Sequence, residues 1–381
     1  MSSQDNYEAV VANASDKVAE FDQGPKGFIG RFQSLLHRFP AAVSLIVLLV
    51  AIPVFGLLID REPIMYSLGL VELEDIGNSR YRFFSLRTLS FILEQVMIVG
   101  IVGAAQALVI LTAGIDLSVG AIMVLSSVVM GQFTFRYGLP VEVAILCGLV
   151  CGGLIGSLNG WLVAVMKLPP FIVTLGMWQI VLAANFLYSA NETIRSQDIS
   201  ADAPLLQFFG QTAMTIGGDE SGRGGANFTY GVLFMILLVA ILAYALRQTA
   251  WGRHVYAVGD DPEAAELSGV NVKKILISVY ALSGLICAFA GWALIGRIGS
   301  VSPTSGQLAN IDSITAVVIG GISLFGGRGS ILGMIFGAFI VGVFTMGLRL
   351  LGADAQWTYL LIGALIIAAV AVDQWIRKVA S

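Results

Sequence analysis

The chain has 381 residues, of which 57% are apolar and only 12% are charged. This composition excludes a disordered chain, which needs low hydrophobicity and high charge, and it argues against a soluble enzyme, because so few charges cannot cover so much apolar surface. The net charge of −4 leaves no basic excess with which to hold nucleic acid. A polytopic membrane protein is therefore the predicted class.

The first 40 residues are polar and carry both acids and bases. An apolar run begins only after Pro40, and no small-residue cleavage site follows it, so this is not the pattern of a cleavable signal peptide. We predict that residues 1–40 form a cytoplasmic tail ahead of a single transmembrane domain at 41–376.

Apolar segments then follow one another along the chain, and each predicts a helix in the bilayer, which needs about 20 residues to cross it. They are residues 41–59, 89–113, 117–135, 143–166, 168–191, 224–246, 275–296, 314–325, 329–348 and 355–372. The segment 314–325 is short, so we expect this span to be re-entrant or broken. The predicted fold class is an all-α polytopic membrane protein with about ten transmembrane helices, some broken or re-entrant.

The longer connections are polar and lie at residues 60–88, 192–223 and 247–274. An even number of spans places both termini on one side of the membrane. All six lysines fall on that side, which the positive-inside rule makes cytoplasmic. The loop 247–274 is then cytoplasmic and the loop 192–223 lies outside, where it is too short to be a domain with its own core.

The cytoplasmic loop contains a compact helix signal in residues 257–272. Asp260 or Asp261 can cap a helix whose first turn holds Pro262, and Gly269 lies where a C-terminal glycine cap is expected. The predicted helix has about two turns and presents two adjacent alanines. It is either an ordinary solvated loop helix or a knob that docks into a groove on another protein.

The stretch Glu263-Ala264-Ala265-x-x-x-Gly269 resembles the coupling motif of permease subunits of ABC importers. The isoleucine and the Leu-Pro pair that usually continue this motif are absent here. That departure is typical of the carbohydrate permeases of the ribose, xylose and galactose group.

Further stretches are similar to the same group of permeases. They are Gly114-Ile-Asp-Leu-Ser-Val-Gly120 and the glycine-rich run at 320–330, and the resemblance covers roughly residues 88–372. Residues 192–199 are similar to fructose-type permeases of the group.

The resemblance implies the membrane-spanning subunit of a bacterial inner-membrane importer for a monosaccharide, a pentose or a hexose such as fructose. It implies a second permease copy as partner, a cytoplasmic ATPase that binds ATP and magnesium, and a periplasmic sugar-binding protein. It also implies that Glu263, Ala264, Ala265 and Gly269 contact the ATPase, and that this chain holds no cofactor.

Several polar side chains lie within or beside the apolar segments. A sugar route needs hydrogen-bonding groups without strong net charge, whereas each such group can also be an ordinary hydrogen bond between helices. For Asp116 we weigh a plain cytoplasmic turn with a helix cap against a broken helix that lines the route. The candidate pathway residues are Glu94, Gln106, Asp116, Ser118, Asn159, Asn185 and Asp312.

The sequence carries no motif for catalysis by this chain. It has no phosphate-binding loop with its lysine, and its two histidines and three cysteines are too scattered to predict a metal site. The alternative to an ABC permease is an ion-coupled secondary transporter of a small polar solute, in which Glu94, Asp116 and Asp312 are the ion sites.

Overall fold

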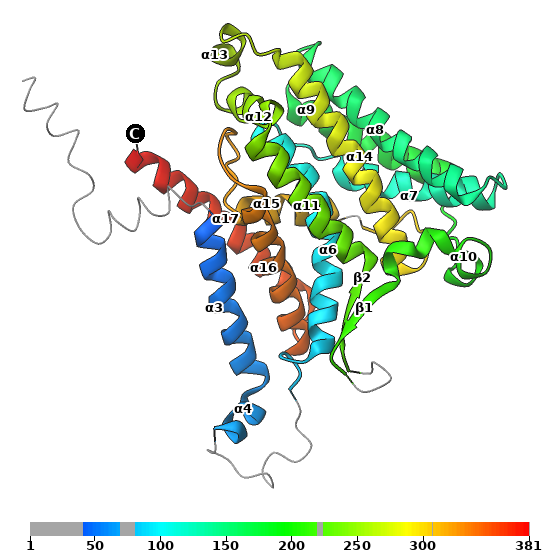
Figure 1. The fold of residues 1–381 in the computed structure, drawn as a ribbon, viewed down its shortest axis with the longest axis vertical. Helices are drawn as coiled ribbons and strands as arrows, with labels where there is room; N and C mark the ends of the chain where they lie inside the picture. Colours follow the sequence, from blue (N-terminus) through cyan, green and yellow to red (C-terminus); the bar gives the residue numbers. More distant parts are fainter. Residues whose placement is uncertain (1–40, 69–80, 219–223, 307, 381) are drawn as a thin grey trace, which may run out of the picture.

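The computed structural model describes residues 41–68, 81–218, 224–306 and 308–380. The predicted tail at 1–40 lies outside the described residues. What is described is a bundle of apolar helices with small polar elements at its two ends (Figure 1).

Every predicted apolar segment contains a helix, although the helix in 314–325 ends at Ile319 and the one in 224–246 begins only at Tyr230. Within the part of the chain that the structure describes, seven helices are long and apolar enough to cross a membrane, and three further apolar helices, α7, α15 and the apolar part of α17, are shorter. The fold class predicted from the sequence is therefore confirmed. These helices are α3 (Ala41–Ile59), α6 (Leu86–Leu111), α7 (Val119–Phe135), α8 (Val141–Ala164), α9 (Pro170–Ser189), α11 (Tyr230–Gln248), α14 (Val272–Ile298), α15 (Ala309–Ile319), α16 (Ile331–Leu350) and α17 (Ala355–Ala380).

The broken span is the one that contains α15. This helix has 11 residues, which corresponds to about 16 Å, roughly half of the hydrocarbon thickness. The preceding residues 299–306 are irregular, and Val301 among them packs on Gly131 near the end of α7. Asn310 near the start of α15 packs on Gly120 near the start of α7. The chain therefore crosses this depth partly as irregular backbone enclosed by protein, where such backbone is tolerated.

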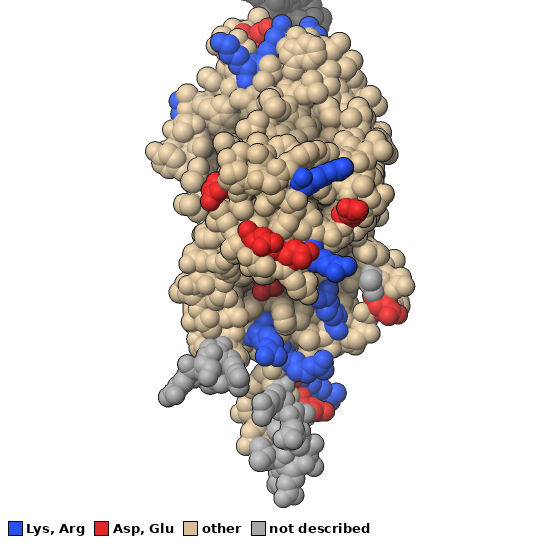
Figure 2. All heavy atoms as spheres, turned by 90° about the vertical axis from the view of Figure 1, so that its right-hand side faces the viewer, with Lys and Arg blue, Asp and Glu red and all other residues tan. Residues whose placement is uncertain are grey.

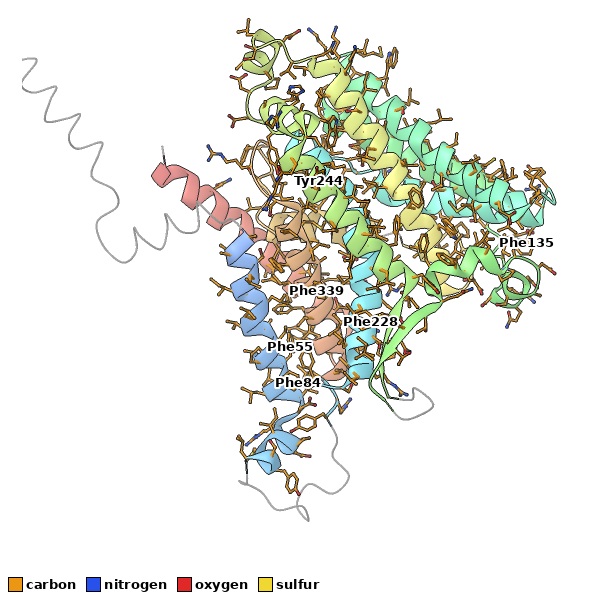
Figure 3. The ribbon with its side chains drawn as sticks, viewed as in Figure 1. Phe55, Phe84, Phe135, Phe228, Tyr244 and Phe339 are labelled. Carbon is orange, nitrogen blue, oxygen red and sulfur yellow. The ribbon has the colours of Figure 1, made fainter. Side chains whose placement is uncertain are left out.

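Helix α6 lies at the centre and is almost entirely buried, whereas α3, α8, α9 and α11 expose apolar side chains outward. Glycines allow very close helix approach: a Cβ at Gly156 of α8 would lie 2.2 Å from the carbonyl oxygen of Tyr280 on α14. At the other side, Phe55 of α3 lies toward α16 and meets Phe344 edge to face, with ring centroids 5.2 Å apart (Figure 3).

One end of the bundle carries the segments that follow α3 and α9. Asp60 is buried beside α4 (Arg61–Ser67), and its carboxylate accepts hydrogen bonds from the backbone N–H groups of Arg82, Phe83 and Phe84. These bonds tie the start of α6 to the end of α3. The opposite end carries α12 (Ala250–Asp260) and α13 (Pro262–Leu267) (Figure 1).

The described part of the segment predicted as a polar loop at 192–223, residues 192–218, is largely structured. It forms α10 (Ser196–Asp202), a 3₁₀ helix η1 (Pro204–Gly210) and β1 (Thr212–Ile216), which pairs antiparallel with β2 (Ala226–Thr229). Trp292 of α14 donates a hydrogen bond to the carbonyl of Leu205 at 3.1 Å. The span predicted from residue 224 begins only at Tyr230, because β2 occupies the residues before it.

Charged side chains are unevenly distributed over the surface that Figure 2 shows. On the face shown in Figure 2, charged side chains lie at the upper end and from about the middle of the face downward, with little charge between these two groups.

Candidate functional site

The loop 247–274 folds into two helices joined by one residue. The carboxylate of Asp261 accepts hydrogen bonds from the N–H groups of Glu263 and Ala264, at 2.9 and 3.0 Å, so Asp261 rather than Asp260 is the cap of α13. Gly269 follows α13 with φ of +86°, the left-handed conformation expected of a glycine cap. The predicted short helix and its caps are confirmed, while α12 was not predicted.

The residues that α13 exposes are not the two adjacent alanines that the sequence predicted. Glu263 and Ala264 are exposed, but Ala265 is buried against its own chain, so the prediction of an exposed Ala265 was wrong. Instead the side chain of Leu267 is 91% exposed. The sequence offered one signal for this residue, which is the single leucine between residues 247 and 274, but Leu267 was not among the predicted contact residues.

Four of the predicted pathway residues come together at the turn between α6 and α7. The carboxylate of Asp116 accepts hydrogen bonds from the N–H and the hydroxyl of Ser118, at 2.8 and 2.6 Å, and Asn159 of α8 donates to the Ser118 hydroxyl at 3.0 Å. With its amide oriented to satisfy both partners, Gln106 of α6 donates to the carbonyl of Asp116 at 2.8 Å and accepts from its N–H at 3.3 Å. All four side chains are buried.

We call residues 112–118, with this bonding, the Asp116 turn. Ser118 stands at the start of α7 but its side chain caps no N–H of that helix. The Asp116 side chain is only 1% exposed, so the turn is enclosed by protein rather than solvated. Thr174 of α9 also donates to the carbonyl of Ile115 at 2.9 Å, which joins a further helix to it.

Polar atoms beside the Asp116 turn retain unused hydrogen-bonding capacity. Within the described residues, the Oδ1 atoms of Asn159 and Asn310 and the hydroxyl of Tyr280 are buried and have no partner. The Tyr280 hydroxyl lies 2.7 Å from where a Cβ at Gly114 would be. Such groups are ready to bind water or a polar solute.

The remaining pathway candidates lie elsewhere. Glu94 and Asp312 interact electrostatically with one cation, the guanidinium of Arg297 at the end of α14. Arg297 also donates a hydrogen bond to Oε1 of Gln95. We call Glu94, Gln95, Arg297 and Asp312 the charged cluster; Arg297 was not among the residues predicted from the sequence.

Asn185 belongs to neither group. Its amide donates to the carbonyl of Pro303 at 2.8 Å, and so holds the irregular segment before α15. Among the described residues no group of three or more His, Cys, Asp or Glu side chains could hold a metal ion.

Comparison with known proteins identifies the family. The family model described as the permease component of branched-chain amino acid transport systems matches residues 88–370. The chain is 65% identical over 375 residues to the fructose import permease protein of Rhizobium meliloti. The matched residues cover 98% of this chain and 96% of that protein.

More distant relatives agree with this match. The chain is 34% identical over 324 residues to the galactose/methyl galactoside import permease protein of Escherichia coli K12, with 82% of this chain and 94% of that protein covered. It is 35% identical over 318 residues to the ribose import permease protein of the same strain, with 83% and 94% covered. No solved structure matches the chain. The chain therefore belongs to the family of import permeases that these matches define.

Proposed function

We propose that the chain is the transmembrane permease of an ABC importer and that its substrate is a monosaccharide, fructose in the first place. The observation that carries the proposal is the 65% identity to a fructose import permease over nearly the whole length of both chains. The relatives for galactose, ribose and xylose are only 33–35% identical, which favours fructose among these sugars.

The positions of the lysines support the orientation that we propose for the chain. The turn that carries Lys167 lies at the end of the bundle where α14 begins with Lys273 and Lys274, since Gly160 of α8 packs on Ile277 of α14. The segment α12–α13 lies at the same end (Figure 1). We assign this end, with both termini, to the cytoplasm and the membrane to the bacterial inner membrane.

The ATPase contact is assigned to α13. Its cap at Asp261 and its glycine at Gly269 fix the direction of a helix of only six residues, which could not hold its shape alone. Ala264 and Leu267 are exposed apolar residues on it. We assign them to a groove on the ATPase, which binds ATP and magnesium, and we assign no hydrolysis to this chain.

The sugar route is assigned to the charged cluster and, further in, to the Asp116 turn. Charged side chains within a membrane protein face water or a protein partner rather than lipid. A second permease copy would cover the charged cluster and enclose a hydrated passage, in which carboxylates, an amide and a guanidinium meet sugar hydroxyls. The surface built from α10, η1 and the hairpin would receive the periplasmic binding protein.

Purification of the permease with its cognate ATPase tests the proposal, the ATPase being identified from neighbouring genes. Leu267→Ala should weaken ATPase binding and fructose uptake together. Leu187→Ala, at a leucine 82% exposed at the other end of the bundle, is the matched control and should change neither. Normal ATPase binding by Leu267→Ala would contradict the assignment of α13.

Uptake of labelled fructose in the presence of unlabelled sugars tests the substrate. Unlabelled fructose should compete, and ribose or galactose should not. Competition by ribose equal to that by fructose would contradict the choice of fructose.

A further inference from the structure

Three backbones meet where α12 ends. Gly259 near the end of α12 lies against Leu111, the last residue of α6, and a Cβ at Gly259 would lie 1.8 Å from the Leu111 carbonyl oxygen. Gly326 and Gly327 come from the loop between α15 and α16, orange in Figure 1, which rises beside α12. A Cβ at Gly326 would lie 2.5 Å from the carbonyl oxygen of Gly259. We call Gly259, Gly326 and Gly327 the glycine junction.

Hydrogen bonds hold the junction closed. The N–H of Gly327 donates to the carbonyl of Leu111 at 3.1 Å. The hydroxyl of Tyr256 on α12 donates to the carbonyl of Gly329 at 2.9 Å. Gly326 and Gly327 have φ of +81° and +69°, so this path of the loop also needs glycine conformations.

The junction touches both functional regions. On one side, α12 continues through the single residue Asp261 into α13. On the other, Leu111 leads directly into the Asp116 turn, and the position of a Cβ at Gly326 is 2.8 Å from the Cβ of Ala113 within that turn. No flexible side chain separates the two regions along this line, so a displacement of α12 cannot be absorbed by a change of rotamer.

We infer that the glycine junction transmits movement of α13 to the Asp116 turn, and that its three glycines are positioning residues for the coupling of ATP hydrolysis to sugar transport. This inference rests on the proposed function. Packed backbones switch between discrete arrangements rather than deform continuously. An ATPase that pulls α13 therefore moves the end of α6 and the polar groups that follow it.

Gly259→Ala in the complete transporter tests the inference. The added methyl group meets the Leu111 carbonyl well inside the 3.4 Å at which ordinary contact begins. Gly153→Ala is the matched control, because it is also a helical glycine and a Cβ there meets nothing within 4 Å. Assembly with the ATPase, melting temperature, ATP hydrolysis and fructose uptake are measured for both variants in proteoliposomes.

The inference predicts that Gly259→Ala assembles and hydrolyses ATP while the sugar imported per ATP falls about tenfold, the size of a lost coupling between sites. Gly153→Ala should keep the wild-type ratio. An assembled Gly259→Ala transporter with the wild-type ratio would overturn the inference. A failure of the proposed function gives a different result from a failure of this inference, because Leu267→Ala would then bind the ATPase normally.

If the Gly259→Ala permease does not assemble with the ATPase, Tyr256→Phe tests the inference instead. This variant adds no atom and removes only the hydrogen bond to Gly329. Sugar imported per ATP should fall about fivefold, in keeping with one lost hydrogen bond, while assembly stays normal. An unchanged ratio in this variant would overturn the inference.

Discussion

Asp116 should hold a turn in shape rather than carry an ion, and two substitutions separate these roles. Asp116→Ala removes the acceptor of two buried donors, the N–H and hydroxyl of Ser118, now bonded at 2.8 and 2.6 Å. Each buried donor left unsatisfied costs about 1–3 kcal/mol, so we expect a loss of about 2–6 kcal/mol in the free energy of unfolding. Asp116→Asn keeps a side-chain oxygen at the same position and should cost about 1–2 kcal/mol.

Thermal melting of the purified permease and fructose uptake in proteoliposomes measure the two effects. Asp116→Ala should lower the melting temperature clearly more than Asp116→Asn, and Asp116→Asn should retain most uptake. Asp202→Asn, at an exposed acid of α10, is the control and should change neither quantity. If Asp116→Asn melts like the wild type but imports no sugar, the carboxylate charge itself acts in transport and this reasoning is refuted.

Leu267→Ala should weaken ATPase binding about 30-fold, because burying this side chain in a groove is worth about 2 kcal/mol; a titration of the ATPase onto immobilised permease measures it. Gly269→Val should lose uptake, since a β-branched residue is strained at φ of +86°, whereas Gly269→Asn should retain most of it; normal uptake by the valine variant would contradict this. Arg297→Gln leaves Glu94 and Asp312 without their shared cation and should lower uptake with ATPase binding intact, as uptake and co-purification assays would show. Burial raises the pKa of Tyr256, so its hydroxyl stays a donor and its hydrogen bond is lost only as the pH rises through that raised value. The difference between wild type and Tyr256→Phe in sugar per ATP should be constant between about pH 6 and 9, below the ordinary tyrosine pKa; a difference that vanishes by pH 9 would contradict it.

The features that the sequence predicted correctly have local causes. An apolar run of about 20 residues has few alternatives to a helix in the bilayer. The order of Asp261, Pro262 and Gly269 similarly specifies where α13 begins and ends, because each residue acts through its own backbone conformation. The short run at 314–325 correctly indicated the broken span.

The features that were not predicted depend on distant contacts. Ser118 bonds to Asn159 on another helix, and the rotation of two apolar helices about their axes leaves no clear trace in membrane sequences, which are apolar on every side. Ala265 and Leu267 are both apolar residues of one short helix. Only the packing of α13 against its own chain determines which of the two is buried.

The elements between residues 192 and 229 were not predicted from the sequence, for a similar reason. Their buried residues depend on distant helices as well as on one another: Leu206 clusters with Ile295 of α14, and Phe209 meets Trp292 of α14, so no periodic pattern marks them. From its sequence alone, a polar segment with a few apolar residues is predicted to be a loop, because the helices on which those residues pack are not known.

The driving force for fructose import tests the central claim most directly. The permease is reconstituted in proteoliposomes with its ATPase and binding protein, and uptake of labelled fructose is measured with and without ATP on the ATPase side and with a protonophore. We expect uptake that requires ATP and both partners and continues when the proton gradient is collapsed. Uptake by the permease alone that stops with the protonophore would contradict the account and identify an ion-coupled transporter.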